Sequence, residues 1–243
     1  MADISLTDHE AVLFDLDGVL TPTADLHRAA WKAAFDEELS RRAGPGGAFE
    51  EFTDADYLDH VDGKPRQDGV RDFLASRSIE LPLGDPGDAP DVGTVWALGN
   101  RKNELFSAVL RRDGISPYPG SLRLVDALDE RGVPMAVVSS SRNAGPVLAA
   151  SGLADRFAAT VDGLVAAELD LAGKPAPDSF LHAASLIGVS PEHAVVVEDA
   201  IPGVEAGAAG GFGLVVGVDR GAGADELLAH GADVVVTDLA DLL

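Results

Sequence analysis

The stretch of sequence that most constrains this chain covers residues 11–19 and reads AVLFDLDGV. Four apolar residues are typical of a buried strand, and Asp15, Asp17 and Gly18 follow them at once. Because side chains two residues apart in an extended segment point the same way, we expect Asp15 and Asp17 to address one point beyond the strand end. Such a pair suits a hard cation: one carboxylate could bind the metal and attack an electrophile while the second moves protons.

This stretch also has two simpler interpretations. Aspartate and glycine are common turn residues, so the local pattern alone leaves an acidic surface turn open. A calcium-binding EF-hand loop would need a further Asp or Asn two residues after Asp17 and a glutamate at the loop end. Val19 stands at the first of these positions, so the EF-hand interpretation is excluded.

The composition limits the partners that such a chain can bind. A length of 243 residues with 46% hydrophobic content allows one large domain, or a core with a smaller insertion. With 41 acidic and 18 basic residues, the net charge of −23 argues against nucleic acid or an anionic membrane as the main partner. The absence of cysteine leaves oxygen or imidazole to hold any metal. No signal core or apolar run of about 18 residues is present, so we expect a cytoplasmic protein.

Beyond residue 115, short β-branched runs alternate with helical segments. This alternation, with the strand at 11–14, is the signature of an α/β fold built on a doubly wound, Rossmann-like parallel sheet. The further strands are predicted at 135–138, 194–197, 214–216 and 234–236, and the helices at 122–130, 146–150, 179–187 and 225–229. Between residue 23 and residue 116 the pattern is helical, and proline-containing connectors flank it. We therefore expect a core domain of residues 1–22 and 117–243, interrupted by a helical domain of residues 23–116.

Polar residues follow several of the predicted strands, and ligands of such a sheet gather at the carboxyl ends of its strands. Ser139 follows the second strand, Glu198 and Asp199 follow the next long one, and Lys174 stands in the loop between them. Each has a structural alternative, as a helix cap or a loop charge. Together they would supply carboxylates for a cation, a hydroxyl for an anion and a fixed positive charge at one edge.

The helical region carries weaker signals. Thr23 can cap a helix that runs to about residue 39, and His27 in its first turn is equally consistent with a partly buried surface histidine and with a substrate role. The polar loop at residues 61–66 is either functional or a solvated turn. Residues 101–103 are expected to open another helix with a basic, solvated face, and most of the four lysines are expected on such faces. The stretch from 81 to 93 is expected to be an exposed excursion.

In order along the chain, Asp15-Leu16-Asp17, Ser139, Lys174 and Glu198-Asp199 resemble the four motifs of the haloacid dehalogenase-like hydrolase superfamily. The helical insertion looks like the cap of its subclass I. Within the superfamily, the chain is most similar to the β-phosphoglucomutases. The residues that carry this likeness are Thr23, His27, Trp31, Lys32, Gly63 to Arg66, Arg101 to Asn103, and Ser141 to Asn143. Where those mutases have an aspartate and two lysines, this chain has Pro22, Asp62 and Arg142, and it has extra residues around 81–95.

The resemblance implies Mg²⁺-dependent phosphoryl transfer. It makes Asp15 the nucleophile that forms an aspartyl phosphate and Asp17 the general acid and base, with Ser139 and Lys174 binding the phosphoryl group. The implied metal ligands are Asp15, the backbone carbonyl of Asp17, Asp199 and, directly or through water, Glu198. The implied substrate-binding residues are Thr23, His27, Gly63, Arg66, Lys102, Ser141, Arg142 and Asn143.

The expected activity is conversion of β-glucose 1-phosphate to glucose 6-phosphate by a monomer or weak homodimer. The small-molecule partner is a sugar phosphate. A sugar-phosphate phosphatase is the main alternative, and a non-enzymatic sugar-phosphate sensor on the same fold is a more remote one. The resemblance also disfavours the dehalogenase and phosphonatase branches, since it implies that they generally lack an acidic residue two positions after the nucleophile, where this chain has Asp17.

Overall fold

The computed structural model describes residue 6 and residues 9–243, and the chain forms two compact units. The first, the core unit, combines Met1–Thr23 with Ile115–Leu243. The second, the helical unit, is Ala24–Gly114. Among the described residues, no helix combines the length and the apolar character needed to cross a membrane.

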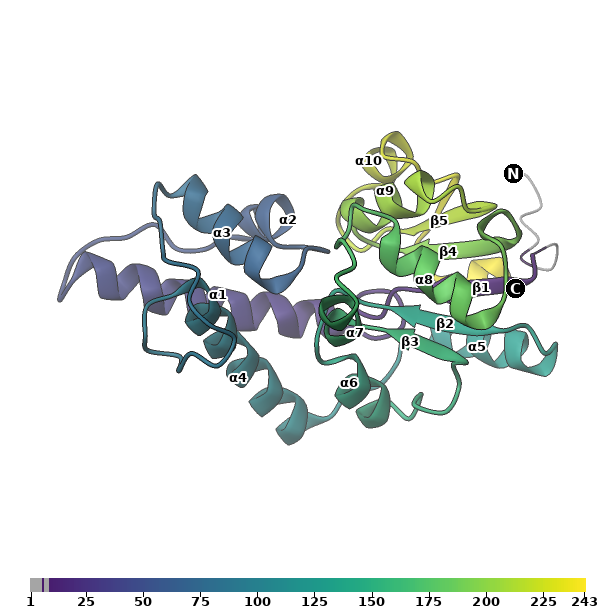
Figure 1. The fold of residues 1–243 in the computed structure, drawn as a ribbon, viewed down its shortest axis with the longest axis horizontal. Coiled ribbons are helices and arrows are strands. Elements are labelled where there is room, and N and C mark those ends of the chain that lie inside the picture. Colours follow the sequence, from purple (N-terminus) through teal and green to yellow (C-terminus); the bar gives the residue numbers. More distant parts are fainter. Residues whose placement is uncertain (1–5, 7–8) are drawn as a thin grey trace. The chain divides into compact units, whose positions relative to one another are not determined.

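The core unit is built on a six-stranded parallel sheet in the order β3-β2-β1-β4-β5-β6 (Figure 1). The strands are β1 (Ala11–Phe14), β2 (Met135–Val138), β3 (Ala159–Val161), β4 (Ala194–Glu198), β5 (Leu214–Val218) and β6 (Val234–Val236). β1 lies in the middle of the sheet, where Phe14 pairs with Val137 of β2 and Val197 of β4. All four residues of β1 are buried, as expected for a strand with both faces covered. The residues that follow β1 are therefore placed at the centre of the carboxyl edge.

Helices connect the strands of the sheet. They are α5 (Pro119–Glu130), α6 (Ala144–Ala150), α7 (Gly163–Glu168), α8 (Asp178–Ile187), α9 (Ile201–Ala209) and α10 (Ala224–Ala229), with short 3₁₀ turns at Pro191–His193 and Leu239–Leu242. Leu13 of β1 belongs to a fully buried cluster with Phe180 of α8 and Val204 of α9. The predicted α/β fold with a doubly wound parallel sheet is confirmed.

The helical unit contains α2 (Asp54–His60), α3 (Arg66–Ser76), α4 (Val95–Asp113) and most of α1 (Thr23–Ala43). Its core is aromatic: the ring of Phe35 lies 5.0 Å from that of Trp31, 5.0 Å from that of Phe52 and 4.3 Å from that of Phe73. Arg77 donates to both carboxylate oxygens of Asp56, each at 2.9 Å, which ties the end of α3 to α2. A cluster of interlocking rings with this ion pair gives the unit a core of its own.

Two expectations for the helical region are wrong. Residues 101–103 do not open a helix, because α4 already begins at Val95, where the Thr94 hydroxyl accepts a hydrogen bond from the Ala97 amide at 3.1 Å. Two of the four lysines, Lys102 and Lys174, are buried instead of solvated. The ammonium group of Lys102 contacts His27 and that of Lys174 contacts Asp15. Each aliphatic side chain can therefore pack in the interior while its charged end keeps a polar partner.

Candidate active site

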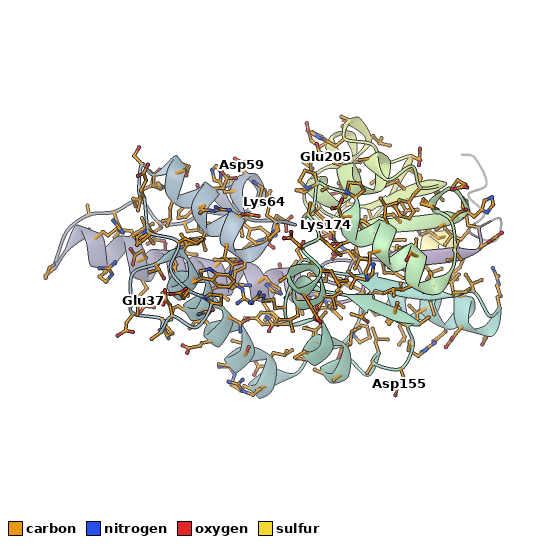
Figure 2. The ribbon with its side chains drawn as sticks, viewed as in Figure 1. Glu37, Asp59, Lys64, Asp155, Lys174 and Glu205 are labelled. Atoms are coloured by element: carbon orange, nitrogen blue, oxygen red, sulfur yellow. The ribbon has the colours of Figure 1, made fainter. Side chains whose placement is uncertain are left out.

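Asp15, the residue directly after β1, faces a buried cation. Lys174 donates to the Asp15 Oδ1 at 2.6 Å and to the backbone carbonyl of Val138 at 3.3 Å, and it also contacts the Glu198 carboxylate. Lys174, which is labelled in Figure 2, comes from the loop before α8, and Glu198 comes from the end of β4. Their contacts bring three segments together at this point. All three side chains are buried. Removal of one partner from a buried group of this kind would leave a buried charge uncompensated.

Burial and charge act in opposite directions on this cluster. Burial raises the pKa of Asp15 well above its ordinary value; the ammonium of Lys174 opposes this rise and the Glu198 carboxylate adds to it. Burial lowers the pKa of Lys174, but the carboxylates of Asp15 and Glu198 outweigh it and hold that pKa above its ordinary value. The lysine is therefore charged, and its single ammonium group faces the two carboxyl groups of Asp15 and Glu198. With both carboxyl groups ionised, the cluster would carry more negative than positive charge.

Asp199 completes a group of three buried carboxylates. Asp15, Glu198 and Asp199 each offer one oxygen, and these oxygens all lie within 4.8 Å of one another. Carboxylate oxygens are the ligands preferred by hard divalent cations, and a cation would balance the charge that Lys174 leaves over. The described residues thus fit a site for such an ion.

Gly18 lets Asp199 reach this cluster. Its backbone has φ +93°, and its amide donates to the carbonyl of Thr21 at 2.8 Å, which closes a tight turn after Asp17. A Cβ atom at this position would stand 1.9 Å from Asp199 Oδ2. Position 18 therefore requires glycine both for its conformation and for the approach of a carboxylate.

Asp17 is held by two hydroxyl groups. Thr23 Oγ1 donates to one of its carboxylate oxygens, and Ser139 Oγ donates to the other at 3.3 Å. Thr21 Oγ1 lies 2.8 Å from the Thr23 hydroxyl and extends this network. Asp17 is half-buried, whereas Asp15 is buried. The two aspartates thus lie in different environments, so their carboxyl groups can differ in proton affinity.

The loop after β2 presents successive hydroxyl groups and amides. Ser139 Oγ accepts from the Ser141 amide at 3.1 Å, and Ser141 Oγ accepts from the Asn143 amide at 3.1 Å. These contacts fix the polar segment 139–143 before α6 begins at Ala144. The structure therefore brings together Asp15, Asp17, Thr23, Ser139, Ser141, Asn143, Lys174, Glu198 and Asp199 in one unit, with Arg142 in the same loop.

In the helical unit, α4 links two of the remaining candidates. Lys102 Nζ contacts His27 Nδ1, and the His27 ring packs 4.1 Å from that of Phe106. Because an ammonium only donates, Nδ1 accepts, and the imidazole proton lies on Nε2. Lys102 also lies over the Trp31 ring at 5.0 Å. This buried arrangement fixes the tautomer and orientation of His27.

Arg66 lies at the start of α3 and donates to Asn103 Oδ1 of α4 at 2.9 Å. Gly63 lies in the turn before it, with φ +68°. The neighbouring Lys64 is held by Asp72 and by the carbonyl of Asp59 at 3.1 Å. Of the two cations in this loop, Lys64 therefore has a structural partner in α3. Arg66 is bound to α4, the helix whose Lys102 contacts His27.

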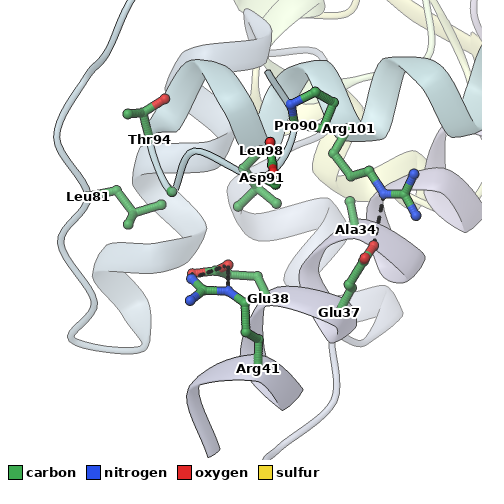
Figure 3. Close-up of a pocket in the computed structure, with 11 residues that line it drawn as sticks. Ala34, Glu37, Glu38, Arg41, Leu81, Pro90, Asp91, Thr94, Leu98 and Arg101 are labelled. Atoms are coloured by element: carbon green, nitrogen blue, oxygen red, sulfur yellow. Dashed lines mark hydrogen bonds and ion pairs between the residues drawn. The ribbon is translucent and has the colours of Figure 1, made fainter. Parts of the chain in front are cut away.

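The extra segment around 81–95 forms a pocket of the helical unit that is distinct from these candidates. The pocket has a volume of about 350 Å³ and is lined by residues of α1, α4 and the segment itself (Figure 3). Four of its charged side chains form two pairs: Arg101 donates to Glu37 at 2.9 Å and Arg41 to Glu38 at 2.8 Å. The segment is anchored to α4 by the Val95 amide, which donates to the carbonyl of Pro82 at 3.0 Å. These contacts account for the segment by packing alone.

Gly203 of α9 is a supporting residue that the sequence analysis did not single out. A Cβ atom at this position would lie 1.8 Å from Glu198 Oε1. We expect Gly203→Ala to displace the Glu198 carboxylate and to lower activity at least about 10-fold, since small misplacements of catalytic groups cost about 100-fold. Steady-state assays and thermal unfolding of the variant would measure both effects.

Gly145→Ala is the matched control, because Gly145 also lies in the first turn of a helix and nothing stands within 4 Å of an added Cβ. Alanine is favoured over glycine in helices by about 1 kcal/mol, so this control should be neutral or slightly stabilising. Equal behaviour of the two variants would mean that the Glu198 carboxylate tolerates displacement.

Comparison with known proteins places the chain in a family. The sequence model of the haloacid dehalogenase-like hydrolases matches residues 9–211. A protein of Mycobacterium tuberculosis named β-phosphoglucomutase is 55% identical over 239 residues, which cover 96% of this chain and 91% of that protein. The chain therefore belongs to the haloacid dehalogenase-like hydrolases and is an enzyme of that family. The family predicted from the four motifs is confirmed.

Solved structures agree with this assignment. The protein CbbY of Rhodobacter sphaeroides, in a mutant form complexed with xylulose 1,5-bisphosphate, has a TM-score of 0.75 and 25% identity, with 96% of each chain covered. A β-phosphoglucomutase of Clostridium difficile shares the fold with a TM-score of 0.76 and 24% identity, covering 97% of this chain and 93% of that one.

Proposed function

We propose that the chain is a β-phosphoglucomutase, which converts β-glucose 1-phosphate to glucose 6-phosphate through an aspartyl phosphate on Asp15. The observation that carries the proposal is the buried contact of Asp15 with Lys174 in a chain 55% identical to a protein of that name. A carboxylate held by a fixed cation at the carboxyl edge of a sheet is suited to attack on a phosphate monoester.

Asp15, Glu198 and Asp199, with the backbone carbonyl of Asp17, would hold Mg²⁺. When bound, the ion would neutralise the charge that a phosphate dianion and a carboxylate nucleophile bring to the same place. The buried cluster of three carboxylates supports this assignment. An oxygen-only donor set is also the kind that Mg²⁺ prefers over softer ligands.

Transfer begins with attack of an Asp15 oxygen on phosphorus, which breaks the bond between phosphorus and the sugar oxygen. Lys174, already 2.6 Å from Asp15, is placed to bind a phosphoryl oxygen next to the nucleophile. Ser139, whose hydroxyl already donates to Asp17 beside the nucleophile, would donate to another phosphoryl oxygen. Positioning and charge neutralisation of this kind supply most of the catalysis in phosphoryl transfer.

Asp17 is the proposed proton carrier. It would protonate the departing sugar oxygen and later remove the proton of the incoming hydroxyl group. The hydroxyl groups of Thr23 and Ser139 fix its two oxygens, so the carboxyl group is oriented before substrate arrives. Its half-buried position leaves it accessible to a ligand.

We assign the helical unit, residues 24–114, the role of a cap that covers the sugar and excludes water. A mutase transfers the phosphoryl group of Asp15 to the 6-hydroxyl of the sugar. The resulting 1,6-bisphosphate must then turn over in the site, so that its 1-phosphate faces Asp15 and can be transferred to it. It therefore needs groups that bind the sugar and its distal phosphate. His27, Gly63, Arg66 and Lys102 are the candidates of the helical unit, and Ser141, Arg142 and Asn143 those of the core unit.

The deciding experiment supplies β-glucose 1-phosphate with Mg²⁺ and a trace of glucose 1,6-bisphosphate and follows glucose 6-phosphate against inorganic phosphate. A mutase gives glucose 6-phosphate as the main product. We expect Arg66→Ala to lower kcat/KM for this conversion about 10- to 100-fold, the loss typical of one charged hydrogen bond. Predominant release of phosphate from the wild-type protein would favour a sugar-phosphate phosphatase.

Arg71→Ala is the control for Arg66. Arg71 lies on the same helix, and its ion pair is with the exposed Asp68 of that helix. Its removal should leave kcat/KM within about threefold, because exposed ion pairs contribute little. If both arginine variants kept full mutase activity, the distal phosphate would be bound elsewhere.

A further inference from the structure

Arg220, in the loop after β5, reaches three other segments of the core unit. Its Nε donates to the carbonyl of Gly18 at 2.9 Å, and its Nη1 donates to the carbonyl of Thr237, just after β6, at 2.9 Å. Its guanidinium carbon lies 4.0 Å from the centre of the Tyr118 ring, within the range of a cation–π contact. One side chain thus joins the loop after β1, the end of β6 and the segment before α5.

The Arg220 loop is itself fixed. The Asp219 amide donates to the Val236 carbonyl at 2.8 Å, and Asp219 Oδ1 accepts from the amides of Gly221 at 2.9 Å and Gly223 at 3.1 Å. This turn holds the base of the Arg220 side chain against the neighbouring strand. The guanidinium therefore acts from a rigid support, which lowers the entropy lost in forming its contacts.

The contact with Gly18 matters because Gly18 has little room to move. On one side it is packed against the carboxylate of Asp199, where even a methyl group would overlap. Gly18 also follows Asp17 directly in the chain, so a shift of its backbone would disturb both Asp17 and the packed carboxylate of Asp199. Fixing the Gly18 carbonyl fixes Asp17 and Asp199 together.

Tyr118 gives the contact a second consequence. Its amide donates to the carbonyl of Leu20 at 3.0 Å, which joins the two chain segments that leave the core unit toward residues 24–114. Arg220 therefore holds the loop after β1 through Gly18 and the returning segment through the Tyr118 ring. Both segments meet at one guanidinium group.

We propose that Arg220 is a positioning residue for phosphoryl transfer, which fixes the backbone of Gly18 next to Asp17 and Asp199 and anchors both connecting segments to the sheet. The expected change in kcat rests on the proposed function. The expected change in the order of the loop after β1 does not depend on that function. Arg220 touches neither substrate nor metal in this role. It acts through the backbone of the loop that carries the aspartates.

Hydrogen exchange of the amides of residues 16–21 and of Tyr118, without added metal or substrate, tests the positioning directly. In Arg220→Ala we expect exchange of these amides at least about 10-fold faster than in wild type, the effect of one lost charged hydrogen bond. In Mg²⁺ with β-glucose 1-phosphate and a trace of glucose 1,6-bisphosphate, kcat should fall about 10- to 100-fold, with KM changed less than about threefold. Arg220→Lys, which keeps a cation near the ring but cannot span both carbonyls, should recover part of kcat.

Arg156→Ala is the control, because Arg156 also bridges two groups of the core unit, Asp126 at 2.7 Å and Asp129 at 2.8 Å. It should leave exchange in both segments and kcat unchanged. Tyr118→Leu removes only the ring contact and should reproduce the Arg220→Ala effects more weakly; it decides the case if Arg220→Ala does not fold. Unchanged exchange and kcat in the Arg220 and Tyr118 variants would overturn the inference. An inactive wild-type protein would instead reject the proposed function. The positioning role of Arg220 would then be tested by the hydrogen-exchange comparison alone.

Discussion

Asp15→Asn is expected to lower phosphoryl transfer by at least about 10⁴-fold, the scale seen when a nucleophile is removed from a group of residues that act together. Asparagine has the size of aspartate and can still accept from the Lys174 ammonium, so the fold should persist. It cannot form an acyl phosphate. The measurement is product formation from β-glucose 1-phosphate, together with intact-mass detection of a phosphorylated protein in wild type and its absence in the variant.

Asp162→Asn is the matched control for this substitution. Asp162 is also buried and also follows a strand of the sheet, β3, but its Oδ1 accepts from the amides of Leu164 at 2.9 Å and Val165 at 3.1 Å and so caps α7. Asparagine caps a helix nearly as well as aspartate, so activity and stability should hardly change. Turnover or a phosphorylated protein in Asp15→Asn would remove Asp15 from its role as nucleophile.

The strands other than β3 could be predicted because each contains a continuous apolar run that is followed by polar or glycine residues. Strand β3 and helix α7 were missed. β3 has only three residues, two of them half-buried at the sheet edge, and α7 has six residues, none of them buried. Their positions depend on pairing with β2 and on the Asp162 cap, which no short periodic pattern reveals.

The carboxyl-edge residues could be predicted for a related reason. Asp15, Ser139 and Glu198 each stand at the end of a buried strand, so the parallel topology alone brings them to one edge. The neighbours that support them could not be predicted in the same way. Gly203 and Arg220 act through contacts between segments far apart in the sequence, and both residue types are common in ordinary loops and helix ends.

A second large effect is expected at Lys174. Lys174→Met keeps the length of the side chain, and its thioether can pack near the Phe180 ring, which lies 5.0 Å from the ammonium. It removes the cation between Asp15 and Glu198, so two buried carboxylates are left facing one another. Breaking a buried pair in this way costs about 3–5 kcal/mol, and loss of the phosphoryl contact should lower kcat about 10²- to 10³-fold.

The loss of stability should depend on pH in a definite direction. Because the pKa of Lys174 is raised in the folded protein, its contribution is complete at neutral pH and disappears only as the pH rises through that raised value. In the variant, the carboxylates can escape repulsion by taking up a proton, and burial already raises the pKa of Asp15. The difference in unfolding free energy between wild type and Lys174→Met should therefore be largest near pH 7 and shrink toward pH 4. Denaturant unfolding without added metal measures it.

Lys32→Met separates the effect of burial from the effect of losing two ion pairs. Lys32 also binds two carboxylates and one carbonyl, with Asp36 at 2.7 Å, Glu51 at 2.8 Å and the Phe52 carbonyl at 3.1 Å. Its side chain is 45% exposed, however, whereas that of Lys174 is 2% exposed. Water can solvate the carboxylates that Lys32 leaves behind, so its removal should cost no more than about 1 kcal/mol and leave kcat unchanged. Equal loss of unfolding free energy in the two variants would show that burial does not increase the cost of removing Lys174. A fall in kcat in both variants would point to a general effect of removing positive charge from this acidic chain.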